Sequence, residues 1–153
     1  MDFRQIEVFI KVVEMAGFSK AASEMHISQP SVSAYIKSVG TNRIFKKEME
    51  LTSAFLSMVQ EIEGTRIIGK KDISDRVSVV SLDFPENDNA VIATLLDEEY
   101  NIKTRCGLHC APSAHKTLDT YPHGTVRFSF GYFNTIGDVD YLVQSIKEVL
   151  KVM

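Results

Sequence analysis

The spacing of apolar residues changes once along this chain of 153 residues. Up to residue 62, apolar side chains recur every three or four positions, which predicts amphipathic helices. From residue 65 onward, short β-branched runs alternate with helical segments, which predicts a small sheet with helices packed on it. A chain of this length holds one ordinary domain or two very small ones, so we expect an α+β protein that begins with helices.

The first 39 residues predict three helices. The first runs from Asp2 and ends at Gly17, and the second follows Ser19, which we expect to be its N-cap. Ser28 is the expected N-cap of the third helix, with Pro30 in its first turn. Three short helices at this spacing are typical of a helix-turn-helix, whose third helix carries the polar recognition face.

The rest of the chain predicts one long helix, over residues 42–62, and a small sheet of about four strands. Strands are expected over 65–68, 76–82, 102–105 and 125–130, and further helices over 88–98, 111–118 and 137–151. The joint between the two parts lies near Val39 and Gly40 and has no spacer rich in Pro, Gly or Ser. We therefore expect two segments, residues 1–39 and residues 40–153.

The charge balance and the apolar runs exclude several classes of partner. Lys and Arg number 17 against 20 Asp and Glu, a net charge of -3, so any contact with DNA must be local. The chain has neither a run of about 18 apolar residues nor a signal peptide, so we expect no membrane contact and a cytoplasmic location. In a reducing compartment, Cys106 and Cys110 favour free thiols over a disulfide.

Residues 1–39 resemble the DNA-binding head of LysR-type transcriptional regulators, through residues 17–22 (GFSKAA) and 27–33 (ISQPSVS). The resemblance implies that Gln29, Ser31 and Ser33 on the third helix meet base edges and phosphates, and that the chain binds DNA as a homodimer. Ala34 stands where the family usually has an arginine. Residues 1–40 carry four basic and four acidic side chains, and a head with no net charge binds DNA weakly.

The longer segment, residues 40–153, resembles the C-terminal small domain of class V aminotransferases, in particular the cysteine desulfurase-like branch. The resemblance covers more than a hundred residues and rests on separated motifs in the order of that family. These motifs are residues 48–52 (EMELT), 105–112 (RCGLHCAP), 115–118 (HKTL) and 124–135 (GTVRFSFGYFNT). The resemblance implies that this segment has the small-domain fold of fold-type I pyridoxal phosphate enzymes.

The same resemblance implies roles for individual side chains. Cys110 matches the nucleophile whose thiolate takes sulfur from cofactor-bound cysteine, and Arg105 and the helix that follows would favour the thiolate. Arg127 matches the arginine that forks onto the substrate carboxylate. His109 either assists proton movement or simply packs. Cys106 is interpreted as a small-residue substitution and not as a second nucleophile.

Three further features have competing interpretations. A metal site made of Cys106, His109, Cys110 and His115 would lack the Cys-x2-Cys spacing of zinc sites. Lys116 ends a Ser-x-His-Lys run that mimics a Schiff-base lysine, which we interpret as a coincidence. Asp119 replaces a glycine of the family, so this loop is strained if that glycine has a positive φ.

The related full-length enzymes bind pyridoxal phosphate in a larger domain, which we do not find in this sequence. We therefore expect no cofactor in this chain alone, and a cofactor-bearing partner chain is one candidate partner. One hypothesis is a truncated or fused desulfurase-like small domain that is inactive by itself. A second is a DNA-binding regulator whose small domain is a sensor or dimerisation module. A third is a rearranged chain without a selected function.

Overall fold

The computed structural model describes residues 3–153, apart from the side chains of residues 3, 38 and 39. Asp2, where the first helix was expected to begin, lies outside the described residues. The chain divides into two compact units, of which the first ends at Lys46 and the second is Lys47–Met153. Each unit is described by itself. The assignment of residues 1–39 and 40–153 to two domains of separate ancestry stays a prediction.

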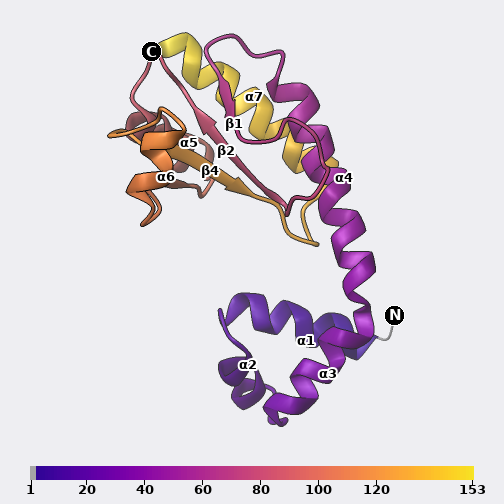
Figure 1. Cartoon of the computed structure of the whole chain (residues 1–153). Helices are drawn as coiled ribbons and strands as arrows, with labels where there is room; N and C mark the ends of the chain where they lie inside the picture. Colours follow the sequence, from indigo (N-terminus) through magenta and orange to yellow (C-terminus); the bar gives the residue numbers. More distant parts are fainter. Residues whose placement is uncertain (1–2) are drawn as a thin grey trace. The chain divides into compact units, whose positions relative to one another are not determined.

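The first unit is helical (Figure 1). It contains α1 (Phe3–Glu14), α2 (Phe18–Glu24), α3 (Gln29–Val39) and the first residues of α4 (Thr41–Val59). Its core is small: Val8, Ala22 and Val32 are buried, and Met25 and Ile27 pack against them. The alanine at position 22 lets the helices approach closely, because it adds little volume between them. The three predicted helices are therefore confirmed.

The N-caps of α2 and α3 differ. Ser28 caps α3 as predicted, because its Oγ accepts a hydrogen bond from the N–H of Ser31 at 3.2 Å. The prediction that Ser19 caps α2 is wrong. The helix begins at Phe18, and its N-cap is Gly17, whose carbonyl already accepts the first helical hydrogen bond from Ala21 at 3.1 Å. Ser19 therefore lies inside the first turn.

The second unit contains a four-stranded sheet in the order β1-β2-β4-β3, in which every neighbouring pair is antiparallel. The strands are β1 (Arg66–Ile68), β2 (Val79–Asp83), β3 (Arg105–Gly107) and β4 (Thr125–Ser129), and the helices after α4 are α5 (Asn89–Tyr100), α6 (Pro112–Thr117) and α7 (Ile136–Val152). This arrangement confirms the expected α+β class. Within residues 3–153, no helix has the length and the apolar character needed to cross a membrane.

Two predicted strands have different bounds in the structure. The second begins at Val79 and not at Arg76, because the Arg76 guanidinium donates hydrogen bonds to the carbonyls of Lys70, Asp72 and Val79 and turns this segment away from the sheet. The third covers Arg105–Gly107 instead of 102–105. Asn101 ends α5 in the left-handed conformation, so the residues just after it complete a helix end and not a strand.

The sheet has one face that the helices cover. Strand alternation places Val80, Leu82, Val126 and Phe128 on this face, where they share a core with buried residues of α4, α5 and α7. The ring of Phe55 on α4 lies 5.5 Å from that of Phe128. Figure 1 shows α4 and α7 running beside the sheet. The opposite face, which we call the open face, carries Ser81, Arg105 and Arg127, because these residues are paired across the strands.

Candidate functional site

Two arginines stand opposite each other on the open face of the sheet. Arg105 on β3 and Arg127 on β4 are directly paired in the antiparallel register, so their side chains leave the sheet on the same side. Arg105 is exposed and Arg127 is half-buried. The Nε atom of Arg127 is buried and has no hydrogen-bond partner among the residues that the structure describes. A buried donor without an acceptor is costly, and an anion placed here would satisfy it.

His109 lies beside the two arginines. It follows β3, and its Nε2 is 3.2 Å from Oγ1 of Thr125 at the start of β4. Burial lowers the pKa of His109, and the positive charges of Arg127, His115 and Arg105 lower it further. Its other ring nitrogen, Nδ1, is buried and unpartnered within the described part of the chain. These surroundings therefore favour the neutral imidazole, whose Nδ1 has no partner among the described residues.

His115 on α6 packs against His109. It is buried, its Nδ1 lies 2.7 Å from Oγ1 of Thr120, and its ring centroid lies 5.8 Å from that of His109. The N–H of Thr120 also donates to the carbonyl of His115 at 2.9 Å. These bonds hold α6 and the loop after it together, so the ring of His115 gives His109 a fixed neighbour.

Cys110 is presented by a tight turn. His109 and Cys110 both have positive φ, 50° and 63°, a region that residues with a Cβ seldom adopt. The N–H of Ala111 donates to the carbonyl of Leu108 at 2.8 Å and closes the turn, and α6 begins one residue later. The thiol of Cys110 is exposed. Two consecutive residues in this conformation are a form of backbone strain that often accompanies functional loops.

The other cysteine has the opposite environment. Cys106 is half-buried on β3 and packs against the core of the second unit. Burial raises the pKa of its thiol, and the negative charge of Asp88 raises it further. A thiol that resists ionisation is a poor nucleophile. The interpretation of Cys106 as a small packing residue is consistent with this environment.

A buried amide holds the strands that carry the site. The Nδ2 of Asn89 donates to a carboxylate oxygen of Asp83 at 2.9 Å and to the carbonyl of Gly124 at 3.1 Å. Its Oδ1 accepts from the N–H of Phe84 at 3.1 Å. Every polar atom of this amide therefore connects α5 to the ends of β2 and β4. Asn89 belongs to no motif, and nothing in the sequence distinguishes it from an ordinary residue at the start of a helix.

The loop before β4 is held by an arginine from the opposite edge of the sheet. Arg66 donates to Oδ2 of Asp83 through Nε at 3.1 Å and Nη2 at 2.8 Å, and its Nη2 also donates to the carbonyl of Asp119 at 2.7 Å. Asp119 has a φ of 55°, the left-handed region that favours glycine, so this loop carries a residue with a Cβ where glycine would be unstrained. Arg66 and Asp83 were not predicted as part of the site.

The residues present do not fit a pyridoxal phosphate site. Lys116, which the sequence places in a Ser-x-His-Lys run, is exposed on the six-residue α6, and its Nζ lies over the ring of Tyr121, 5.1 Å from the centroid. A Schiff-base lysine needs an enclosed position beside the cofactor ring. Residues 3–153 contain no group of three or more His, Cys, Asp or Glu side chains arranged to hold a metal ion.

The predicted DNA-contacting residues lie in the first unit, on α3. Gln29 is exposed, and Ser31 and Ser33 are half-buried. Ser31 takes part in the helix cap, because its Oγ lies 2.8 Å from Oγ of Ser28. A cavity of about 400 Å³ is lined by Gln5, Ser31, Ala34 and Tyr35. The first turn of α3 is therefore polar, and Ala34 lies one turn further along the helix.

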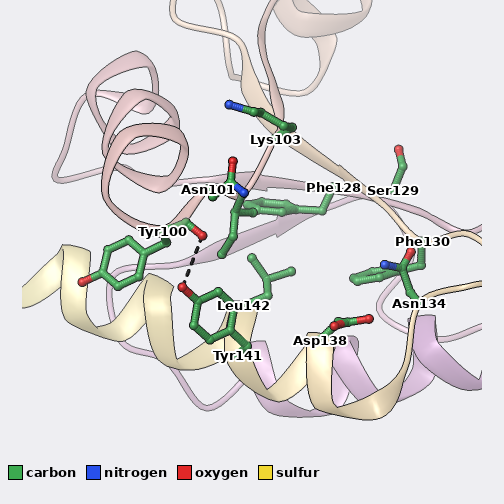
Figure 2. A pocket seen from close by; sticks show the side chains of 11 residues that line it. Tyr100, Asn101, Lys103, Phe128, Ser129, Phe130, Asn134, Asp138, Tyr141 and Leu142 are labelled. Carbon is green, nitrogen blue, oxygen red and sulfur yellow. Dashed lines mark hydrogen bonds between the residues drawn. The ribbon is translucent and has the colours of Figure 1, made fainter. Parts of the chain in front are cut away.

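One cavity of the second unit contains none of the predicted site residues. It has a volume of about 390 Å³ and lies between the end of α5, the end of β4 and the start of α7. Figure 2 shows Phe128, Phe130 and Leu142 facing it, with Tyr100 and Tyr141 at one end. The hydroxyl of Tyr141 donates to the carbonyl of Tyr100 at 3.2 Å. This cavity has an aromatic lining and does not touch the arginines of the open face.

Two family models match the chain. Residues 26–142 match the model described as aminotransferase class-V. Residues 3–41 match the model described as bacterial regulatory helix-turn-helix protein, lysR family. The two matches overlap over residues 26–41, which includes α3. Both resemblances predicted from the sequence are therefore confirmed.

Curated relatives and solved structures agree with the longer match. The chain is 36% identical over 115 residues to a probable cysteine desulfurase of Staphylococcus epidermidis, with 74% of this chain and 27% of the relative covered. It is 32% identical over 116 residues to probable cysteine desulfurase 2 of Mycobacterium leprae, with 76% and 27% covered. The chain therefore spans about a quarter of the length of these relatives.

Among solved structures, the apo cysteine desulfurase of Thermococcus onnurineus NA1 superposes with a TM-score of 0.74 at 28% identity, covering 82% of this chain and 30% of that one. The cysteine desulfurase CsdA (S-sulfonic acid) from Escherichia coli superposes with a TM-score of 0.67 at 27% identity, covering 80% and 30%. The fold of the second unit is thus shared with part of these larger chains.

Proposed function

Since the chain belongs to the class V aminotransferase family, we propose that its second unit is the substrate-binding half of a cysteine desulfurase-like active site. In this proposal Arg127 binds the carboxylate of an amino acid substrate through its planar fork of donors. Cys110 is the residue that accepts sulfur. Arg105 adds positive charge beside the carboxylate, and His109 completes the polar wall of the site.

The observation that carries the proposal is the unpartnered Nε of Arg127. Most buried donors in a folded protein have an acceptor, whereas the Nε of Arg127 has none among the described residues. The Nε of Arg76 is also unpartnered, but that guanidinium is already bound to the carbonyls of Lys70, Asp72 and Val79 and has no second arginine paired with it. The register supports the same ligand, because Arg105 stands directly across the strand pair. A carboxylate matches this arrangement, since it accepts two parallel hydrogen bonds from one guanidinium.

We propose further that this unit does not turn over cysteine by itself. Breaking the C–S bond of cysteine leaves an electron pair on carbon, and pyridoxal phosphate supplies the electron sink for it in related enzymes when it is bound. Lys116 does not fit the lysine that would hold this cofactor. We propose that this unit works with a cofactor-bearing partner.

Two assays test these proposals on the full chain. We expect L-alanine, which has the backbone of cysteine without its thiol, to shift the NMR amide signals of β3 and β4 in a saturable manner. Arg127→Lys keeps the charge but loses the fork, and it should weaken this binding about tenfold.

We also expect no sulfide from L-cysteine with added pyridoxal phosphate. Sulfide release above that of Cys110→Ser would contradict the proposed inactivity.

A second function is proposed for the first unit, namely DNA binding through α3. The lysR-family match and the Ser28 cap support it, because the cap orients the polar N-terminal turn of a recognition helix. Gln29 and Ser33 would contact bases, and Ser31 would contact phosphate. As in other helix-turn-helix dimers, we expect a homodimer with recognition helices about 34 Å apart. The second unit would then act as a sensor or dimerisation module.

A gel shift at low ionic strength tests this second function. We expect weak binding that decreases steeply with added salt, because phosphate contacts release counterions. Gln29→Ala should weaken it, whereas Gln60→Ala, a matched change in the second unit, should not. The absence of any complex at low ionic strength would overturn the assignment.

A further inference from the structure

The loop after β3 brings His109 to the place where Arg105 and Arg127 meet. His109 is hydrogen-bonded to Thr125, and Thr125 is two residues before Arg127 on β4. Alternate residues of a strand share a face, so Thr125 and Arg127 point to the same side of the sheet. Arg105 is paired with Arg127 and completes the group. Arg105, Arg127 and His109 therefore lie on the same face of the sheet, near enough for both arginines to lower the pKa of His109.

Two atoms in this group have no partner. They are Nδ1 of His109 and Nε of Arg127, and both are buried within the described chain. The arginine can only donate a hydrogen bond, whereas the histidine nitrogen can donate only when it carries a proton. In the tautomer whose Nε2–H donates to Oγ1 of Thr125, Nδ1 becomes a second donor beside Arg127 only when the ring takes up another proton. One carboxylate could then satisfy both atoms.

We propose that the imidazole of His109 is a ligand for the carboxylate that Arg127 binds, and that it takes up a proton from solvent as the carboxylate enters. The proposal rests on the proposed function of Arg127. In the free protein the surroundings oppose that proton. The groups that act on His109 are Arg127 on β4, Arg105 on β3 and His115 on α6, with the thiol of Cys110 next to it in the chain.

The direction of the effect follows from these charges. Without a ligand, burial and the neighbouring positive charges hold the pKa of His109 below its ordinary value. A bound carboxylate compensates the charge of the arginines and attracts the imidazolium, so the pKa rises. Binding and protonation then favour each other, and the affinity for the carboxylate increases as the pH falls through the range between the two pKa values. A rise of one pKa unit corresponds to about tenfold tighter binding at the acidic end.

L-Alanine is a suitable probe, because its carboxylate stays ionised and its amine stays protonated between pH 5.5 and pH 7.5. We would titrate it into the full chain at several pH values in this range and follow the amide signals of β4. The dissociation constant is expected to be about threefold to tenfold lower at pH 5.5 than at pH 7.5. His109→Gln should remove this dependence. His123→Gln, which changes an exposed histidine, should retain the dependence.

A second measurement follows the pKa of His109 in the unsubstituted chain. The imidazole C–H signals of His109 report its pKa directly, and this pKa should rise when L-alanine is present at saturation. Saturable binding with the same dissociation constant at every pH, or an unchanged His109 pKa, would overturn the role of His109 and leave the Arg127 site intact. An absence of L-alanine binding at every pH would overturn the Arg127 site itself, and the role of His109 with it.

Discussion

Gly124 and Gly107 meet backbone to backbone: a Cβ on Gly124 would lie 2.2 Å from the carbonyl carbon and oxygen of Gly107. Gly124 precedes β4, and Gly107 is the last residue of β3, so this contact joins the strands that carry Arg127 and Arg105. Gly124 also has a φ of 75°. A side chain at this position would therefore push β3 and the turn of Cys110 away from β4.

Gly124→Ala should destabilise the second unit more than a positive φ alone explains. Gly64→Ala is the matched control, because Gly64 has a φ of 79° and open space around it. The control should cost about 1–2 kcal/mol for its conformation, and Gly124→Ala about 1–3 kcal/mol more for the clash. Urea unfolding followed through the amide signals of β2 and β4 measures both. Equal losses would mean that the close contact is unimportant.

Asn89→Ala should lower the free energy of unfolding of the second unit by about 3 kcal/mol. The change leaves the N–H of Phe84 and the carbonyl of Gly124 buried without the partner that Asn89 supplies. Asn87→Ala removes the half-exposed amide of the preceding turn and should cost less than about 1 kcal/mol. The same urea experiment compares the two. If the variants were equally stable, the amide network would not hold the strands.

The two thiols should differ in reactivity. Alkylation by iodoacetamide at pH 7.5, read by mass spectrometry, should modify Cys110 at least about tenfold faster than Cys106, because Cys110 is exposed and burial raises the pKa of Cys106. Cys106→Ser and Cys110→Ser give the separate rates. Faster reaction at Cys106 would contradict the assignment of Cys110 as the sulfur acceptor.

The start of α7 should lose stability in acid. Hydrogen bonds from the N–H and hydroxyl of Thr135 lower the pKa of Asp138, and these residues form a capping box. A carboxylate with a lowered pKa contributes stability above its ordinary pKa, and that contribution is lost as the pH falls toward the lowered value. Asp138→Ala should therefore cost about 1 kcal/mol at pH 6 and clearly less at pH 3, measured by urea unfolding. If Asp138→Ala lowered the free energy of unfolding equally at pH 6 and pH 3, the ionised carboxylate of Asp138 would not stabilise the start of α7.

Much of this fold can be predicted from the sequence, because periodicity and caps are local. Ser28 before a proline predicts the start of α3, and the alternation over residues 125–130 predicts β4. The bounds of β2 and β3 could not be predicted in the same way. They depend on which nearby carbonyls accept the Arg76 guanidinium and on the left-handed conformation of Asn101 at the end of α5, and neither is visible in the spacing of apolar residues.

The site divides in a similar way. Arg127, Arg105 and Cys110 are predicted by their motifs, yet the pairing of the two arginines follows only from the strand register. Asn89, Arg66 and Asp83 belong to no motif, because they act by holding other groups and bind nothing themselves. A buried amide that connects two strands cannot be recognised until the chain is folded.

The account depends most on a carboxylate site at Arg127, and the Nε–H signal of this side chain tests it most directly. In the full chain with nitrogen-15 labelling, this signal can be assigned by its loss in Arg127→Lys. We predict that L-alanine moves it downfield in a saturable manner, because the N–H gains an acceptor, while the Arg76 Nε–H signal stays in place. An Arg127 signal that does not respond to L-alanine at any concentration would contradict the central claim.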